Sequence, residues 1–186
     1  MLIIDGHLDL SLNAIQWERD LTQSVYTIRV QENRDHRKGR AQGTVALPEM
    51  RQGRIALSFI TLLARSTGHP VSGMDFRSPA QAYGMAHGQL AYYRALAEDG
   101  HLRFVGDKST LTRHMAEWTD WEQMADPKRM PPLGVVLSME GADPILEPAQ
   151  LAYWYNAGLR LLGPTHYGPG RYAGGTGVED GLTSLG

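Results

Sequence analysis

RIALSFITLLA, residues 54–64, is the most strongly apolar stretch of this 186-residue chain. A short, continuous apolar run of this kind is typical of a strand buried on both faces, as in a parallel sheet. It is too short for a membrane span, which needs roughly 20 apolar residues. These positions therefore predict a central strand of a buried sheet.

Shorter apolar runs flank this stretch on both sides. LII at residues 2–4, LGVVLSM at 133–139 and LRLL at 159–162 each predict a further buried parallel strand. LRFV at 102–105 is a shorter strand candidate. The chain thus holds about five strands, with the short one the least defined.

A helix is predicted between the second and third of these strands. Ser78 can cap its N-terminus, Pro79 suits the first helical position, and Gln81 completes a capping box. An apolar stripe at helical spacing continues to about Asp99, and Gly100 ends the helix.

Two more helices are expected at residues 111–124 and 148–156. Alternation of apolar strands with helices favours a parallel sheet covered by helices, either an open doubly wound sheet or a (β/α)8 barrel. No Gly-x-Gly-x-x-Gly follows the first strand, which removes the main support for a dinucleotide fold. The long polar stretch up to residue 53 is expected to be functional or to hold structure of its own.

The composition excludes several classes of protein. The net charge is -2, from 18 basic and 20 acidic residues, so no basic excess indicates a nucleic-acid partner. The chain has no cysteine, so any metal must be held by His, Asp and Glu. Neither a secretory signal nor a membrane segment is recognisable, which makes the cytoplasm the expected location.

The first strand runs into Asp5-Gly6-His7-Leu8-Asp9. Residues i and i+2 of a strand point the same way, so His7 and Asp9 share a side while Leu8 faces away. An imidazole and a carboxylate together suit zinc or a similar divalent metal. A surface turn in which the aspartate caps a helix is the alternative.

Two more strand ends carry residues of this type. Glu140 follows the run at 133–139, and a carboxylate buried there should be paired or bound to metal. His166 follows the strand at 159–162, where it could bind metal, bind a substrate oxyanion or transfer protons. A salt-bridged or solvated Glu140 and a turn-bound His166 are the alternatives.

The shared position of the three candidate groups favours a functional site over the structural alternatives. All three groups lie at the carboxyl ends of predicted parallel strands, where barrels and open α/β sheets build their active sites. Asp143 precedes a proline and suggests a turn or cap. The other histidines fall in predicted loops and helices and are weak candidates: His36, His69, His87, His101 and His114.

Four linked motifs resemble the membrane (renal) dipeptidase family. They are the Asp-Gly-His-x-Asp of residues 5–9, the Met-Glu-Gly of 139–141, the Gly-Leu-Arg…Thr-His of 158–166, and the closing Gly-Leu-Thr-x-x-Gly of 181–186. The resemblance implies a (β/α)8 barrel of the amidohydrolase type that hydrolyses dipeptides at two zinc ions.

The resemblance also implies roles for individual residues. His7 and Asp9 would bind the first zinc, and Glu140 would bridge both. His166 would act in the substrate site and help to stabilise the tetrahedral intermediate. The catalytic residues would thus be Glu140 and His166. The same ligand types also accept manganese or cobalt.

The family's second zinc needs two histidines from later strands, and an aspartate and an arginine complete its site, whereas this sequence ends at Gly186. The expected fold is therefore α/β, the N-terminal half of a (β/α)8 TIM barrel, as a single domain over residues 1–186 truncated before the remaining ligands. Weak metal binding and little or no catalysis are expected. Unclosed sheet edges make a homo-oligomer one expected state.

Two other functions remain open. One is a metal-dependent amidohydrolase that acts on a different amide, lactam or lactone. The other is a fragment without catalytic activity that serves as a binding or assembly module.

Overall fold

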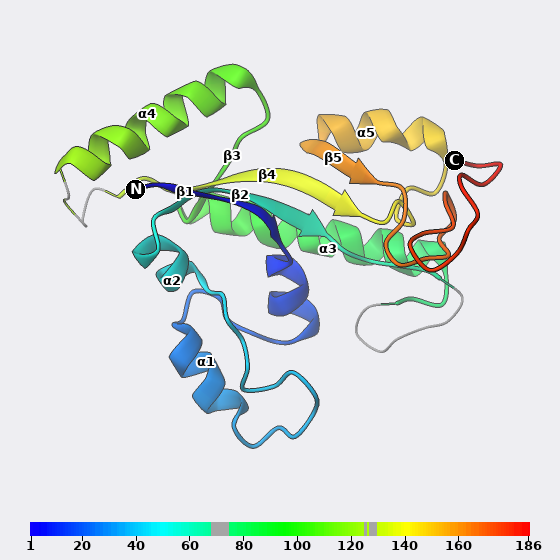
Figure 1. Ribbon diagram of the computed structural model, residues 1–186, viewed down its shortest axis with the longest axis horizontal. Coiled ribbons are helices and arrows are strands. Elements are labelled where there is room, and N and C mark those ends of the chain that lie inside the picture. The colour runs from blue at the N-terminus through cyan, green and yellow to red at the C-terminus, as the bar shows by residue number, and fades with distance from the viewer. Residues whose placement is uncertain (68–74, 125, 127–129) are drawn as a thin grey trace.

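A five-stranded parallel sheet with helices packed around it forms the protein (Figure 1). The structure is a computed structural model that describes residues 1–67, 75–124, 126 and 130–186. All strand pairs are parallel, which confirms the α/β class. The strands are β1 (Ile3–Leu8), β2 (Ile55–Leu62), β3 (Leu102–Phe104), β4 (Leu133–Glu140) and β5 (Leu159–Gly163).

The order of the strands in space differs from their order in the chain. β2 pairs directly with β4, from Leu57↔Gly134 to Leu62↔Met139, so β3 does not lie between them. β3 instead pairs with the first part of the other edge of β4, and β5 pairs with the last part of that edge. The two long apolar strands thus form the continuous centre of the sheet, and the three-residue β3 is an addition at its margin.

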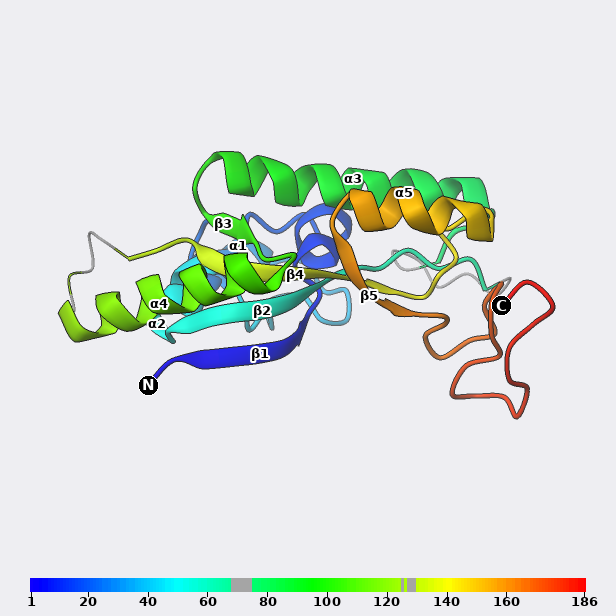
Figure 2. The ribbon, with the colours of Figure 1, turned by 90° about the horizontal axis from the view of Figure 1, so that it is seen from above.

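Helix α3 (Pro79–Glu98) covers one side of the sheet, with α5 (Leu151–Asn156) beside it (Figure 2). The predicted capping box of Ser78 and Gln81 is present. The buried stripe of α3 matches the predicted helical spacing, and a 3-10 turn, η3 (Pro148–Gln150), leads into α5. The buried residues of α3 are Ala82, Ala86, Gln89, Leu90, Tyr93 and Leu96.

Helix α4 (Lys108–Met124) begins three residues earlier than the predicted start at residue 111. The reason is Asp107, whose carboxylate accepts hydrogen bonds from the Thr110 backbone N–H and the Ser109 hydroxyl. This is the N-cap interaction that satisfies the free amides of a first helical turn. The proline predicted to stop the helix, Pro127, lies outside the described residues.

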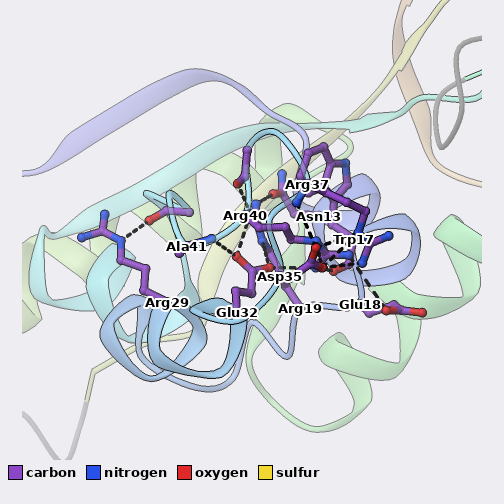
Figure 3. A network of polar contacts seen from close by, with 12 residues as sticks. Asn13, Trp17, Glu18, Arg19, Arg29, Glu32, Asp35, Arg37, Arg40 and Ala41 are labelled. Carbon is purple, nitrogen blue, oxygen red and sulfur yellow. Dashed lines mark hydrogen bonds and ion pairs between the residues drawn. The ribbon is translucent and has the colours of Figure 1, made fainter.

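The polar stretch before β2 has structure of its own. It contains a π-helical turn, η1 (Leu12–Gln16), and two short helices, α1 (Val25–Glu32) and α2 (Leu47–Gln52). A buried ion-pair cluster holds this segment together, with Glu32 between Arg19 and Arg40 (Figure 3).

The first strand departs from its prediction. Residues 2–4 predicted a strand buried on both faces, yet Ile3 and Ile4 of β1 are 41% and 58% exposed. The cause is position: β1 is an edge strand, and among the described strands only β2 flanks it. The strand also extends to Leu8, so His7 belongs to it.

No helix within the described ranges combines the length and the hydropathy that crossing a membrane requires. That residues 1–186 form a single domain stays a prediction.

Candidate metal centre

Three strands bring their polar ends to one edge of the sheet. His7 is the fifth residue of β1, with Asp9 one residue past the strand's end, and Glu140 is the last residue of β4. His166 follows three residues after β5 ends at Gly163, which pairs with Glu140. Because parallel strands end together, residues far apart in the sequence meet here.

His7, Asp9 and Glu140 form a compact cluster. Each offers a ligand atom, and these atoms all lie within 4.8 Å of one another. His7 Nε2 is 3.5 Å from Asp9 Oδ1 and 3.2 Å from Glu140 Oε2. It is the one such group found among the described residues. A single divalent cation is within reach of all three side chains.

One carboxylate oxygen in the cluster has no hydrogen bond. Glu140 Oε2 is buried and accepts no hydrogen bond, although His7 Nε2 lies 3.2 Å away. An unsatisfied buried carboxylate oxygen is costly, and a cation would satisfy it. One imidazole and two carboxylates are a donor set that fits zinc, so the residues present fit a metal.

Space for a substrate lies beside the cluster. A pocket of about 330 Å³ is lined by His7 and Glu140, by Thr61 on β2 and by apolar residues of β2, β4 and β5. A small molecule in this pocket would contact the ligand cluster directly.

Asp9 is held by residues that the sequence did not single out. The Thr61 hydroxyl donates to Asp9 Oδ1, and the Asn13 side chain donates to the Asp9 carbonyl at 2.9 Å. The Thr61 carbonyl in turn accepts hydrogen bonds from Ser11 Oγ and from the Tyr93 hydroxyl. Burial raises the pKa of Tyr93, so the phenol stays protonated and donates. The signal in the sequence that could have identified Thr61 was its polar side chain near the end of the most apolar strand.

His166 joins the cluster from the other side. Its Nε2 lies 2.9 Å from Glu140 Oε1, and its Nδ1 lies 2.9 Å from Arg65 Nη1. Arg65 also donates through Nη2 to Asp75 Oδ2 at 2.9 Å. Sequence reasoning missed Arg65 and Asp75. The signal for Arg65 was a cation placed directly after the apolar run of residues 54–64.

The remaining candidates lie elsewhere, as expected. His36, His87, His101 and His114 are not in the cluster, and His69 falls outside the described residues. His114 is fully buried with Nε2 2.7 Å from the Ala56 carbonyl, and burial lowers its pKa.

Asp143 accepts hydrogen bonds from the backbone N–H groups of Ser66 and Arg171. This carboxylate ties loops together, in line with the turn role predicted for it.

Fold and site together define an α/β protein with a parallel sheet and a histidine–carboxylate cluster at the carboxyl edge of that sheet. The family model of the membrane dipeptidases, peptidase family M19, matches residues 1–186. The chain belongs to this family, which confirms the resemblance seen in the four motifs. A comparison with curated protein sequences finds no match.

Solved structures show the same fold. A dipeptidase described as a metallo peptidase of family M19 matches with a TM-score of 0.58 and 19% identity, over 93% of this chain and 45% of that chain. A metallo peptidase from Rhodobacter sphaeroides, bound to a phosphinate mimic of the dipeptide L-Ala-D-Ala, matches with a TM-score of 0.59 and 18% identity. The match covers 93% of this chain and 48% of that chain. The probable dipeptidase PvdM from Pseudomonas aeruginosa matches with a TM-score of 0.57 and 15% identity, over 94% of this chain and 37% of that chain.

This chain therefore spans less than half the length of each of these proteins. Its fold is the N-terminal portion of a TIM-barrel-like α/β structure, as predicted.

Proposed function

We propose that this chain carries the first half of the active site of a zinc-dependent dipeptidase. Membership of the membrane dipeptidase family supports the reaction class. The observation that carries the proposal is the unsatisfied Glu140 Oε2, which lies in a cluster with His7 and Asp9. A structural neighbour bound to a dipeptide mimic supports the substrate class.

In this proposal His7, Asp9 and Glu140 hold a zinc ion, with manganese or cobalt as substitutes. Bound there, the metal would supply water of lowered pKa and polarise the scissile carbonyl. The carboxylate of Glu140 has one oxygen toward His7 and the other toward His166. In a complete site Glu140 would also be a ligand of a second metal, as the family resemblance implies. The three side chains suffice for one metal, and a binuclear centre needs further ligands.

His166 is the proposed substrate-binding and catalytic residue beside the metal. Its imidazole is mostly buried, and its Nε2 faces the Glu140 carboxylate. A neutral N–H donor in this place would bind the carbonyl oxygen of a dipeptide and stabilise the negative charge that develops on that oxygen.

Zinc content and a substrate panel test the proposal together. The purified 186-residue chain is dialysed against zinc, and its metal content is measured beside that of Glu140→Gln. We expect one zinc per wild-type chain, held weakly, and none at this site in the variant. A wild-type chain without zinc would favour a non-catalytic module.

The panel then compares dipeptides with lactams, lactones and other amides. We expect any turnover to be slow and confined to dipeptides, because three ligands make only part of the binuclear site. Fast dipeptide hydrolysis would contradict the expected weakness of this chain alone. Hydrolysis of a lactone but of no dipeptide would show a different amidohydrolase.

A further inference from the structure

We propose that Arg65 is a positioning residue, which fixes the imidazole of His166 with its hydrogen on Nε2. The inference rests on the proposed function in one respect: His166 is taken as the group that faces the substrate. The arrangement of Arg65, Asp75 and His166 is independent of any metal.

Arg65 is held firmly at both ends. Its side chain is only 10% exposed, and the Asp75 carboxylate accepts a hydrogen bond from Nη2 at 2.9 Å. Its backbone carbonyl accepts a hydrogen bond from the Phe76 N–H at 2.7 Å, and an isolated parallel bridge joins Arg65 to Asp75. The guanidinium therefore has little freedom to move away from His166.

The contact between Arg65 and His166 decides which ring nitrogen carries the hydrogen. A guanidinium has donors and no acceptor, so at 2.9 Å the Nδ1 atom of His166 must offer its lone pair to Arg65 Nη1. A hydrogen on Nδ1 would point at another N–H. The ring hydrogen therefore lies on Nε2, the atom that is 2.9 Å from Glu140 Oε1.

This arrangement gives the site a fixed donor. Stabilisation of a developing oxyanion depends on donors that already point at it before the reaction. If the ring could exchange tautomers freely, Nε2 would at times present a lone pair, which repels an oxyanion. The positive charge behind Nδ1 also polarises the ring and strengthens the Nε2–H as a donor.

A purely structural role for the ion pair between Arg65 and Asp75 would not explain the orientation of the guanidinium. Arg65 Nε is buried without a hydrogen-bond partner, an unfavourable state for a guanidinium nitrogen. The orientation that leaves Nε unsatisfied is the one that places Nη1 on His166 and Nη2 on Asp75. The contact with His166 accounts for that orientation.

Nitrogen NMR of the histidine rings tests the proposal directly. The metal-free chain is labelled with 15N-histidine and studied at about pH 8, where an ordinary histidine is neutral. The His166 signals are assigned by their loss in His166→Gln. We expect a pyridine-like signal for Nδ1 and a pyrrole-like signal for Nε2 in the wild-type chain.

Substitution of Arg65 should release the ring. In Arg65→Met the tautomer ratio of His166 is expected to change on the order of 10- to 100-fold, the weight of a hydrogen bond to a charged donor. Arg65→Lys should restore much of the wild-type pattern, because an ammonium also only donates. The matched control is Arg51→Met, whose guanidinium donates to the Pro131 and His101 carbonyls, and it should leave the His166 signals unchanged.

Two results would overturn the proposal: a wild-type His166 with its hydrogen on Nδ1, or an Arg65→Met spectrum with the wild-type His166 pattern. If Arg65→Met does not fold, the wild-type and Arg65→Lys spectra decide. Zinc binding separates this proposal from the proposed function. A chain that shows the expected NMR pattern but binds no zinc refutes the dipeptidase site and leaves the role of Arg65 standing.

Discussion

Glu32 and Glu140 are both largely withdrawn from solvent, yet their surroundings differ. Glu32 accepts hydrogen bonds from Arg19 Nε and Nη2, from Arg40 Nη1 and from the Ala41 N–H. Glu140 lies against His7 and His166, and one of its oxygens accepts no hydrogen bond. Two carboxylates of one chain are thus satisfied to very different degrees.

We infer that the difference separates a structural carboxylate, Glu32, from one that serves the proposed metal site, Glu140. Around Glu32 two arginines supply the positive charge, so the cluster needs nothing from outside the protein. Among the described residues no arginine or lysine forms an ion pair with Glu140 itself, because the Arg65 guanidinium contacts His166 instead. Asp9 adds a second negative charge to the cluster. An unsatisfied buried carboxylate oxygen is unfavourable, and in the proposed function a cation would satisfy it.

The largest effect on stability is expected at the ion-pair cluster of Glu32, Arg19 and Arg40. Glu32→Gln removes the charge that pairs Arg19 and Arg40, and breaking a buried ion pair by losing one partner costs about 3–5 kcal/mol. Urea unfolding of wild type and variant measures the loss. The control is Glu117→Gln at the more exposed pair with Arg103, where about 1 kcal/mol or less is expected. Equal losses of unfolding free energy in Glu32→Gln and Glu117→Gln would contradict the structural role given to Glu32.

Acid should reveal the same cluster. Burial raises the pKa of Glu32, but hydrogen bonds from Arg19, Arg40 and Ala41 outweigh it and lower the pKa from 4.5 to about 2. Because the pKa is lower in the folded state, ionised Glu32 contributes to the free energy of unfolding. This contribution is complete above about pH 4.5 and disappears as the pH falls toward 2. Its size is about 3 kcal/mol.

Unfolding free energies measured between about pH 6 and pH 3 test this, since part of the effect falls in that window. Wild type should lose more stability than Glu32→Gln over the range. Parallel curves for the two proteins would show that Glu32 does not titrate as described.

At the candidate metal site of His7, Asp9 and Glu140, the support of Asp9 by Thr61 should affect the affinity for the metal. Thr61→Val keeps the shape of the side chain and removes the hydroxyl that donates to Asp9 Oδ1. Loss of such a supporting hydrogen bond lowers metal affinity about 10- to 100-fold. Calorimetric zinc titrations would measure it, with Thr61→Ser as the variant that keeps the hydroxyl. Wild-type affinity in Thr61→Val would show that this contact has no such role.

The smallest effect is expected for Glu140→Gln without metal. The substitution removes a carboxylate charge of which one oxygen, Oε2, has no donor, so the metal-free stability should change by less than about 1 kcal/mol, or even rise. Urea unfolding in the presence of a chelator measures it. A loss as large as that of Glu32→Gln would mean that Glu140 is a structural carboxylate.

Local patterns in the sequence were enough to predict much of the fold and the site. Apolar runs located the strands, and residues at their carboxyl ends had to meet because the strands are parallel. His7, Asp9, Glu140 and His166 were therefore predicted together, and the structure does bring them together.

Features that depend on non-local packing were not predictable in the same way. The hydrogen bond of Thr61 to Asp9 joins residues 52 positions apart, and that of Arg65 to His166 joins residues 101 apart. The exposure of β1 depends on its place at the edge of the sheet, which no local pattern encodes. The Glu32 cluster depends on the fold of residues 10–53, where the polar composition predicted some structure or function but not which residues meet.

The stability of the chain as a function of zinc tests the central claim most directly. Wild type and Glu140→Gln are unfolded in urea at increasing zinc concentration. If His7, Asp9 and Glu140 hold the ion, wild type gains about 2.7 kcal/mol when free zinc reaches about 100 times its dissociation constant, and the variant gains little. Equal gains in both proteins, or none in the wild type, would contradict the account.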